Sequence, residues 1–353
     1  MTERSRASLI LPVVSGVAIW LSFPDVSLVF LAWVGLIPYL WFLVRKPSWP
    51  KTILGHLLFA LPYFGGVLYW IPRVMVVHGG FSWPLAVLLF GVLLIALAVF
   101  LFPFTLLVRL VAGRSAGQAL ICAPGFWLLT EVLRNYFAVN GFPWGLIGYS
   151  QYPYLWLIQV ADLGGVYLVS YIVVLGNAAL LAGLKFRRWR FLAISATILV
   201  VANLYGVYRA YLWRPARLHD MQVALVQANV ALAENTDHYA TKYFEAMPGY
   251  YRRAAAAGAD LVVFPEAQNP YLYPRDFYYR TFLERMVASD PAYLIFNSSF
   301  EESKGRYFNS AFLLGKEGKA VFRYDKVHLV PFGEYVPAAS WLDFFEPLVR
   351  EVS

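Results

Sequence analysis

The chain has 353 residues, of which 60% are apolar and 14% are charged, and its formal net charge is +8. This composition excludes an ordinary soluble globular protein, so membrane insertion is the first expectation. The positive excess lies wholly in the first part of the chain, in short clusters between apolar runs, which is typical of membrane topology and argues against a nucleic-acid partner.

The charge balance also predicts two unlike parts. Residues 1–213 contain fourteen Lys and Arg against four Asp and Glu, whereas residues 214–353 contain fifteen against seventeen. We therefore expect a membrane domain over residues 1–213 and a polar domain over residues 214–353.

Seven apolar segments occur in the first part. They lie at about residues 8–22, 28–44, 52–71, 83–107, 119–133, 164–184 and 191–212. Most approach the roughly 20 residues that a helix needs to cross a bilayer, and a backbone in lipid must be helical to satisfy its own hydrogen bonds. No small-residue cleavage pattern follows the first segment, so we expect a span there and not a cleaved signal. The prediction is about seven transmembrane helices.

The basic residues between these segments predict the orientation. If the amino terminus is cytoplasmic, eleven Lys and Arg fall in cytoplasmic segments, against Arg73 and Arg134 outside. Basic residues favour the cytoplasmic side. With seven spans, the polar domain then lies across the membrane from the amino terminus. For a bacterial protein this predicts a multi-pass inner-membrane location with a periplasmic or other extracytoplasmic polar domain.

The loop after the fifth segment, residues 131–151, is dense in Trp, Tyr, Phe, Pro and Gly. One interpretation is an aromatic belt at head-group depth, with Glu131 and Arg134 paired within one helical turn. The other is a loop that lines an entrance for a lipid-borne substrate. Composition leaves both open. Asp162, at the mouth of the sixth segment, is expected to be an interfacial cap and not a functional acid inside the membrane.

The polar domain has the pattern of an α/β fold. Strands are predicted at residues 223–229, 261–264, 293–297, 310–314 and 320–324, and helices at 239–257 and 277–288. Gly258 follows the first helix where a stop is expected, and residues 315–318 form a hairpin-like turn. Strand, helix, strand and helix followed by antiparallel strands predict a layered α/β sandwich.

One run in this domain has the residue types of a catalytic site. It is Arg-Tyr-Asp-Lys-Val-His-Leu-Val-Pro-Phe-Gly-Glu-Tyr-Val-Pro, residues 323–337, which contains Lys326, His328 and Glu334. Spacing alone favours a salt-bridged loop for Lys326 and Glu334. His328 is expected to be structural, satisfying a local hydrogen bond.

A second run supplies the anchor that a functional interpretation needs. Leu-Val-Val-Phe-Pro-Glu, residues 261–266, places the Glu266 carboxylate just past the carboxyl end of a buried strand. A carboxylate and a lysine at the ends of two strands are suited to proton transfer and to stabilising negative charge.

The order of these motifs resembles the carbon-nitrogen hydrolase (nitrilase) superfamily. The matching features are the strand at 223–229, Val-Phe-Pro-Glu ending at Glu266, Asn-Ser-Ala from Asn309, and the run around Lys326 and Glu334. Together with the membrane segments and the run Gly-Phe-Pro-Trp-Gly-Leu-Ile-Gly-Tyr-Ser-Gln ending at Gln151, the chain resembles the membrane-embedded apolipoprotein N-acyltransferase family over essentially its whole length. The resemblance implies an αββα nitrilase-like sandwich, incomplete at its carboxyl end, after the membrane helices.

What the resemblance implies is a two-step acyl transfer. A cysteine thiolate takes an acyl chain from a membrane phospholipid and passes it to the amino-terminal amine of a lipid-modified apolipoprotein. By matching position, Glu266 is the general base, Lys326 stabilises the oxyanion, and Glu334 holds the lysine. The implied partners are the phospholipid donor, the apolipoprotein acceptor and the bilayer. No cofactor or metal is expected, because the sequence shows no metal cluster and no phosphate-cradling glycine loop.

The nucleophilic cysteine of that family is missing from the sequence. In the family it follows the lysine on a strand-to-helix turn, and a final membrane span comes after it. Cys122 is the single cysteine and lies in a predicted span before the polar domain. We therefore expect residues 1–353 alone to be inactive in acyl transfer and the sandwich to be left with uncovered apolar faces. Two alternatives remain, a membrane-tethered nitrilase-type amidase and a non-catalytic membrane protein that binds lipid or lipoprotein; the aromatic loop argues against the first.

Overall fold

A computed structural model describes residues 3–77, 79–137, 141–212, 221–227, 236–266, 271–290, 292–303 and 306–329. Within them the chain forms two compact units, a helical unit and a sheet unit. The stretch 213–220 separates the two, so the predicted boundary at 213/214 lies outside the described residues.

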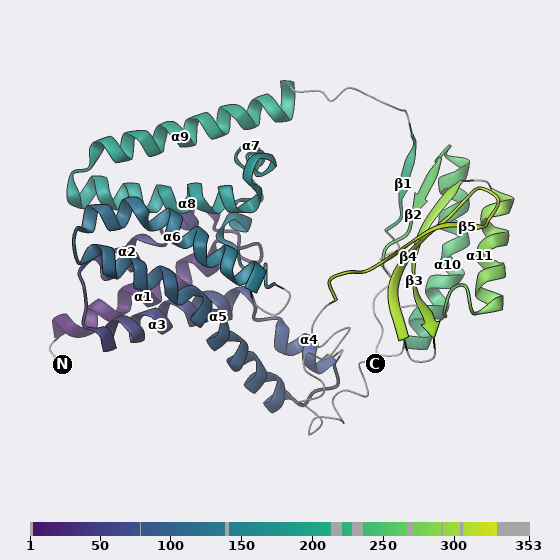
Figure 1. The fold of residues 1–353 in the computed structure, drawn as a ribbon, viewed down its shortest axis with the longest axis horizontal. Helices are drawn as coiled ribbons and strands as arrows, with labels where there is room; N and C mark the ends of the chain where they lie inside the picture. The colour runs from purple at the N-terminus through teal and green to yellow at the C-terminus, as the bar shows by residue number, and fades with distance from the viewer. Residues whose placement is uncertain are drawn as a thin grey trace. The chain divides into compact units, whose positions relative to one another are not determined.

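The helical unit is built from helices of very different length (Figure 1). In chain order they are α1 (Glu3–Leu21), η1 (Val29–Trp33), α2 (Ile37–Val44), α3 (Trp49–Val67), α4 (Ile71–Val77), α5 (Trp83–Ala112), α6 (Ala116–Phe137), η2 (Ile147–Gln151), α7 (Leu155–Ile158), α8 (Ala161–Phe186), α9 (Trp189–Val207) and η3 (Tyr208–Leu212). Proline stands in the first turn of α2, α3 and α5, where its missing N–H removes no hydrogen bond.

All seven predicted apolar segments are helical, but they differ in how far they could reach across a bilayer. Among the described residues four helices are long and apolar enough to cross a membrane, at Trp83–Ala112, Ala116–Phe137, Ala161–Phe186 and Trp189–Tyr211. The pair α3 and α4 would make a fifth, with a bend of 48°. The first two segments form shorter apolar helices, and the second of them is divided into η1 and α2. Seven crossings therefore stay a prediction.

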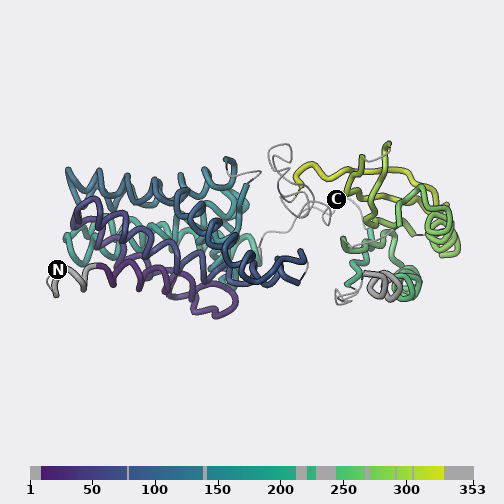
Figure 2. Tube along the Cα trace, turned by 90° about the horizontal axis from the view of Figure 1, so that it is seen from below, coloured from purple at the N-terminus to yellow at the C-terminus, as the bar shows by residue number. Residues whose placement is uncertain are grey.

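Aromatic side chains fill the centre of the helical unit. Trp127 of α6 is 1% exposed and contacts Phe104 of α5, with ring centroids 5.1 Å apart, and Tyr63 of α3 at 6.3 Å. Close approach of α1 to α3 requires a glycine, because a Cβ on Gly16 would collide with the carbonyl oxygen of Phe59. Figure 2 shows the long helices of this unit running alongside one another.

The outward surface of the helical unit is apolar. On α5 the side chains of Leu88 and Val99 are 64% and 67% exposed, and on α9 Leu204 is 63% exposed. An apolar outer surface over helices of this length is what a lipid environment requires.

The sheet unit contains one five-stranded sheet among the described residues, in the order β1-β2-β3-β4-β5 (Figure 1). Its elements are β1 (Val223–Leu225), α10 (Thr236–Ala256), β2 (Leu261–Val263), α11 (Phe277–Ser289), β3 (Tyr293–Ser303), β4 (Arg306–Leu314) and β5 (Ala320–Asp325). The first three strands are parallel, and β4 and β5 are antiparallel to their neighbours. The predicted α/β class is confirmed.

One face of this sheet is covered by α10 and α11. Leu294 pairs with Leu314, and Phe296 pairs with Phe312, across β3 and β4. All four side chains are at most 4% exposed. The helices add the remaining core residues, chiefly Met247 and Tyr251 of α10 and Leu283, Met286 and Val287 of α11.

The opposite face presents apolar side chains to the outside. Leu225 of β1 is 79% exposed, and Phe322 and Tyr324 of β5 are 64% and 54% exposed. In a sandwich such a face packs against a second sheet. The described strands form only one sheet, so none of them covers this face, which is called the open face below.

The strands differ from prediction mainly in length. β3 and β4 are longer than predicted, since they continue through a polar stretch that carries no apolar alternation and is held by antiparallel pairing from Phe296 to Ser303. β1 is shorter in the described structure, and the end of the predicted 223–229 strand lies outside the described residues. The turn at 315–318 is confirmed by the Gly315 N–H, which donates to the Lys319 carbonyl at 2.8 Å.

Phe296 offers a test of which sheet face carries the stability of this unit. Phe296→Ala should lower the free energy of opening of the sheet unit by about 3–5 kcal/mol, because it leaves a cavity among buried rings. Phe322→Ala, on the open face, should change it by no more than about 0.5 kcal/mol. Amide hydrogen exchange of β2 and β3 peptides measures both. Equal effects of the two substitutions would show that the covered face has been wrongly assigned.

Candidate functional site

Glu266 stands just beyond the end of β2. The pairing with β3 continues one residue past the strand, since the Phe264 N–H donates to the Ile295 carbonyl at 2.9 Å. Phe264 then turns into the core, where it is 4% exposed. The Glu266 side chain is 65% exposed. The carboxylate therefore follows a strand end that is hydrogen-bonded to β3, and it remains exposed.

Two groups from other strands meet the Glu266 carboxylate. The Asn309 side chain of β4 donates from Nδ2 to Glu266 Oε1 at 2.7 Å. The Lys326 ammonium, one residue past β5, lies with Nζ 3.7 Å from the same oxygen. A charge pair at this distance on an exposed carboxylate contributes little to stability. The two contacts instead place a positive charge and an amide donor next to the carboxylate.

Asn309 is itself held in one orientation. Asn297 of β3 donates from Nδ2 to Asn309 Oδ1 at 2.6 Å and to the Ser310 carbonyl at 3.2 Å. The amide of Asn309 is therefore turned with its NH₂ group toward Glu266. In addition, the backbone N–H of Lys326 donates to the Asn309 carbonyl at 2.8 Å, which holds the lysine backbone beside the asparagine.

A further ion pair fixes the end of β5 next to Lys326. Asp325 accepts a hydrogen bond from Ser310 Oγ at 2.6 Å and pairs with Arg323, whose Nε lies 3.1 Å from Oδ1. The Arg323 guanidinium stacks over the Phe300 ring, 3.7 Å from its centroid. These contacts join β3, β4 and β5 at the residue that precedes Lys326.

The structure thus brings together two of the three predicted site residues, Glu266 and Lys326. Glu334 lies outside the described residues, so its predicted contact with the lysine stays a prediction. His328 is exposed, and its structural role also stays a prediction. The sequence analysis gave no role to Asn297 or Asn309. The available signal was an asparagine on each of two strands that pair with each other, next to Ile295 of β3 and Ala311 and Leu313 of β4 on the same face.

Chemically, this arrangement is suited to proton transfer next to a positive charge. An accessible carboxylate can accept a proton, and an ammonium group can stabilise an oxyanion. Among the described residues no group of three or more His, Cys, Asp or Glu is placed to hold a metal ion.

The aromatic loop after α6 is pinned from several helices. Glu131 Oε1 accepts hydrogen bonds from the Ile147 N–H and from Trp127 Nε1, each at 2.9 Å. Tyr63 of α3 donates its hydroxyl to the Gly145 carbonyl, and further anchors come from Trp33 to Gln151 at 2.9 Å and from the Gly148 N–H to Ser170 at 2.9 Å. Hydrogen bonds from several helices therefore hold residues 145–151 of the loop in place.

The anchored backbone holds a row of aromatic side chains outward. Trp144, Tyr149 and Tyr152 are 48%, 41% and 47% exposed. An interfacial belt and a substrate entrance both remain predictions for this row.

Three charged residues of the helical unit were given roles in the sequence analysis. Glu131 and Arg134 are only 2% and 4% exposed, and Arg134 lies over the Phe64 ring at 5.1 Å; the pairing of the two stays a prediction. Asp162 is not a helix cap. It accepts hydrogen bonds from the Tyr205 hydroxyl at 2.8 and 3.0 Å and pairs with Arg209 Nε at 2.8 Å, which ties the start of α8 to α9 and η3.

Glu131→Ala should strongly destabilise the helical unit. The substitution leaves the Trp127 and Ile147 donors and the Arg134 charge buried without the carboxylate, a loss of about 3–5 kcal/mol. Thermal unfolding of the detergent-solubilised protein, followed by tryptophan fluorescence, measures it. Glu131→Gln keeps an oxygen acceptor and should cost clearly less. An unchanged melting temperature in Glu131→Ala would contradict the anchoring role.

Comparisons with known proteins agree on both units. Residues 15–179 match the family described as Apolipoprotein N-acyltransferase N-terminal domain, and residues 222–346 match the Carbon-nitrogen hydrolase family. An apolipoprotein N-acyltransferase of Geobacter metallireducens is 33% identical, with 98% of this chain and 68% of that protein covered. One of Photobacterium profundum is 28% identical, with 99% and 68% covered. The chain thus spans about two thirds of the length of these relatives.

Among solved structures, a carbon-nitrogen hydrolase from Helicobacter pylori is 23% identical, with 31% of this chain and 39% of that chain covered. The TM-score is 0.23, which is too low to support any conclusion about fold.

Proposed function

The chain belongs to the apolipoprotein N-acyltransferase family of acyltransferases, and on that premise we propose how its residues take part in lipoprotein N-acylation. The proposed reaction transfers an acyl chain from a membrane phospholipid to the amino-terminal amine of the diacylglyceryl-cysteine of an apolipoprotein, through a cysteine thioester. The observation that carries the proposal is the Glu266 carboxylate, hydrogen-bonded to Asn309 beside the Lys326 ammonium.

Glu266 acts as the general base of both steps. In the first step its carboxylate takes the thiol proton, the thiolate attacks the phospholipid ester carbonyl, and the proton passes to the leaving lysophospholipid oxygen. In the second step the carboxylate takes a proton from the attacking amine, the thioester C–S bond breaks, and the released thiolate regains a proton. The exposure of Glu266 suits a base that serves two incoming groups.

Lys326 stabilises the negative charge that forms on the carbonyl oxygen in each tetrahedral intermediate. Its backbone bond to Asn309 fixes where its side chain begins. The role proposed for Glu334, which lies outside the described residues, is to hold the ammonium group. Asn309 positions the carboxylate without taking part in proton transfer.

The nucleophile is a cysteine other than Cys122. Cys122 is exposed on α6 and lies about two helical turns from the start of that helix. The aromatic loop follows the opposite end of α6. In the proposed orientation the start of α6 is cytoplasmic, so the bilayer separates this thiol from Glu266.

Substitution of the two site residues tests the proposed roles. In the protein isolated from its native membrane, Glu266→Gln and Lys326→Met should each slow acyl-thioester formation, by about 10²–10⁴-fold for the base and about 10²–10³-fold for the oxyanion partner. The readout is transfer of label from a fluorescent phospholipid into a hydroxylamine-sensitive protein adduct. Lys319→Met, an exposed lysine of the same unit, should have no effect. Normal rates in either site variant would refute its assigned role.

Residues 1–353 produced alone should give no N-acylated product, because they supply no thiol beside Glu266. Purified polypeptide is mixed with phospholipid vesicles and a diacylglyceryl-cysteine peptide, and the peptide mass is followed. An added acyl chain on the peptide, with no second polypeptide present, would overturn this expectation.

We also propose that the amino terminus is cytoplasmic and that the sheet unit lies on the outer side of the inner membrane. With Cys122→Ala as background, Glu317→Cys in the β4–β5 turn should react with a membrane-impermeant maleimide added to cells with a permeabilised outer membrane. Lys46→Cys, between α2 and α3, should react only after the inner membrane is opened. The reverse pattern would invert the topology.

A further inference from the structure

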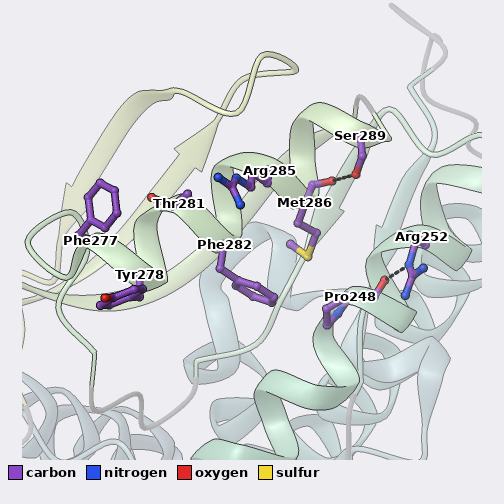
Figure 3. A pocket seen from close by; sticks show the side chains of 9 residues that line it. All are labelled: Pro248, Arg252, Phe277, Tyr278, Thr281, Phe282, Arg285, Met286 and Ser289. Carbon is purple, nitrogen blue, oxygen red and sulfur yellow. Dashed lines mark hydrogen bonds between the residues drawn. The ribbon is translucent and has the colours of Figure 1, made fainter.

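A groove runs between α10 and α11 on the side of these helices that faces away from the sheet. It has a volume of about 560 Å³ and lies apart from Glu266 and Lys326. Figure 3 shows Phe282 and Met286 of α11 pointing toward Pro248 and Arg252 of α10. These side chains make an apolar floor at the line where the two helices meet.

The rim of the groove is basic and rich in hydroxyl groups. Arg252 and Arg285 both line it and are exposed, and Tyr278, Thr281 and Ser289 add hydroxyls. Among the residues that the structure describes, none that lines the groove carries a carboxylate. The nearby Glu284 is paired with Arg280, with Oε1 and Nε 3.7 Å apart. An anion entering the groove therefore meets guanidinium donors and no competing acid.

Large aromatic rings stand exposed at one end of the groove. Phe277 is 61% exposed and Tyr278 is 85% exposed, although both begin a helix whose inner face is well buried. The Arg280 guanidinium lies 5.6 Å from the Phe277 ring centroid. Exposed aromatic side chains next to arginines are the combination found where a protein meets the head-group region of a bilayer.

A short segment joins the sheet unit to the helical unit. Leu212 ends the last apolar helix and Val223 begins β1, so ten residues join the two. Fully extended, they reach about 35 Å. Leu212 and Val223 therefore cannot be farther apart than this, which makes a bilayer that holds the helical unit a possible partner of the sheet unit; an anionic surface attracts each exposed arginine.

We propose that the α10–α11 groove docks the sheet unit on the membrane surface by binding anionic phospholipid head groups. Arg252 and Arg285 contact the phosphate, and Phe277 and Tyr278 enter the head-group layer. This contact is separate from acyl-donor binding at Glu266 and does not depend on the proposed acyl transfer. It limits the orientations of the sheet unit to those with this groove against the bilayer.

The test uses the full chain reconstituted in vesicles, with Cys122→Ala and a nitroxide label at Ala288→Cys, an exposed position on α11 outside the groove lining. The probe is phosphatidylglycerol in phosphatidylcholine, compared with phosphatidylcholine alone. Collisions of the label with an aqueous nickel chelate should fall several-fold in the anionic vesicles and recover at high salt. Arg252→Gln combined with Arg285→Gln should abolish the protection.

A matched control is available on α10, the helix that carries Arg252. Arg253 is exposed on α10 but does not line the groove, so Arg253→Gln should leave the protection unchanged. Equal nickel collisions in both lipids, or equal loss with Arg253→Gln, would overturn the proposal. Protection that is the same in both lipids and depends on protein concentration would also overturn it, since it would identify a second copy of the chain as the occupant.

Discussion

The contacts of the Glu266 carboxylate depend on the antiparallel register of β3, β4 and β5. That register puts Asn309 where its amide reaches Glu266 and where its carbonyl binds the backbone of Lys326. A slip of one residue would turn Asn309 to the covered face and remove both contacts. The buried pairs Leu294 with Leu314 and Phe296 with Phe312 resist such a slip, so the core on one face maintains the site on the other.

The two units distribute polar and apolar side chains in different ways. The helical unit exposes apolar side chains outward and keeps polar groups, such as the buried Glu131, for fixing its loops from within. The sheet unit buries one face under α10 and α11 and presents its polar site at the strand ends. Its second, open face carries Leu225 and Phe322 at high exposure. An αββα sandwich would cover that face with a further sheet.

The sequence was most informative where periodicity and residue chemistry coincide. Seven apolar segments and the strand before Glu266 could be anticipated in this way. A common site of Lys326 and Glu266 was expected only from the family resemblance, because spacing alone favoured a salt bridge of Lys326 with Glu334. The lengths of β3 and β4 could not, because backbone pairing, and not apolar alternation, extends them. The burial of Glu131 was missed because composition does not tell how deeply a side chain is buried. Its hydrogen bond to the Ile147 N–H joins residues that are 16 positions apart in the sequence. Asn297 was missed because its role is to orient another side chain.

The central claim is that Glu266 and Lys326 act as one catalytic unit, and a double-mutant cycle on acyl-thioester formation tests it most directly. If they share one transition state, Glu266→Gln combined with Lys326→Met should be no slower than the slower single variant, because residues that act together lose their effect together. Losses that multiply in the double variant would show two independent contributions and would contradict the claim.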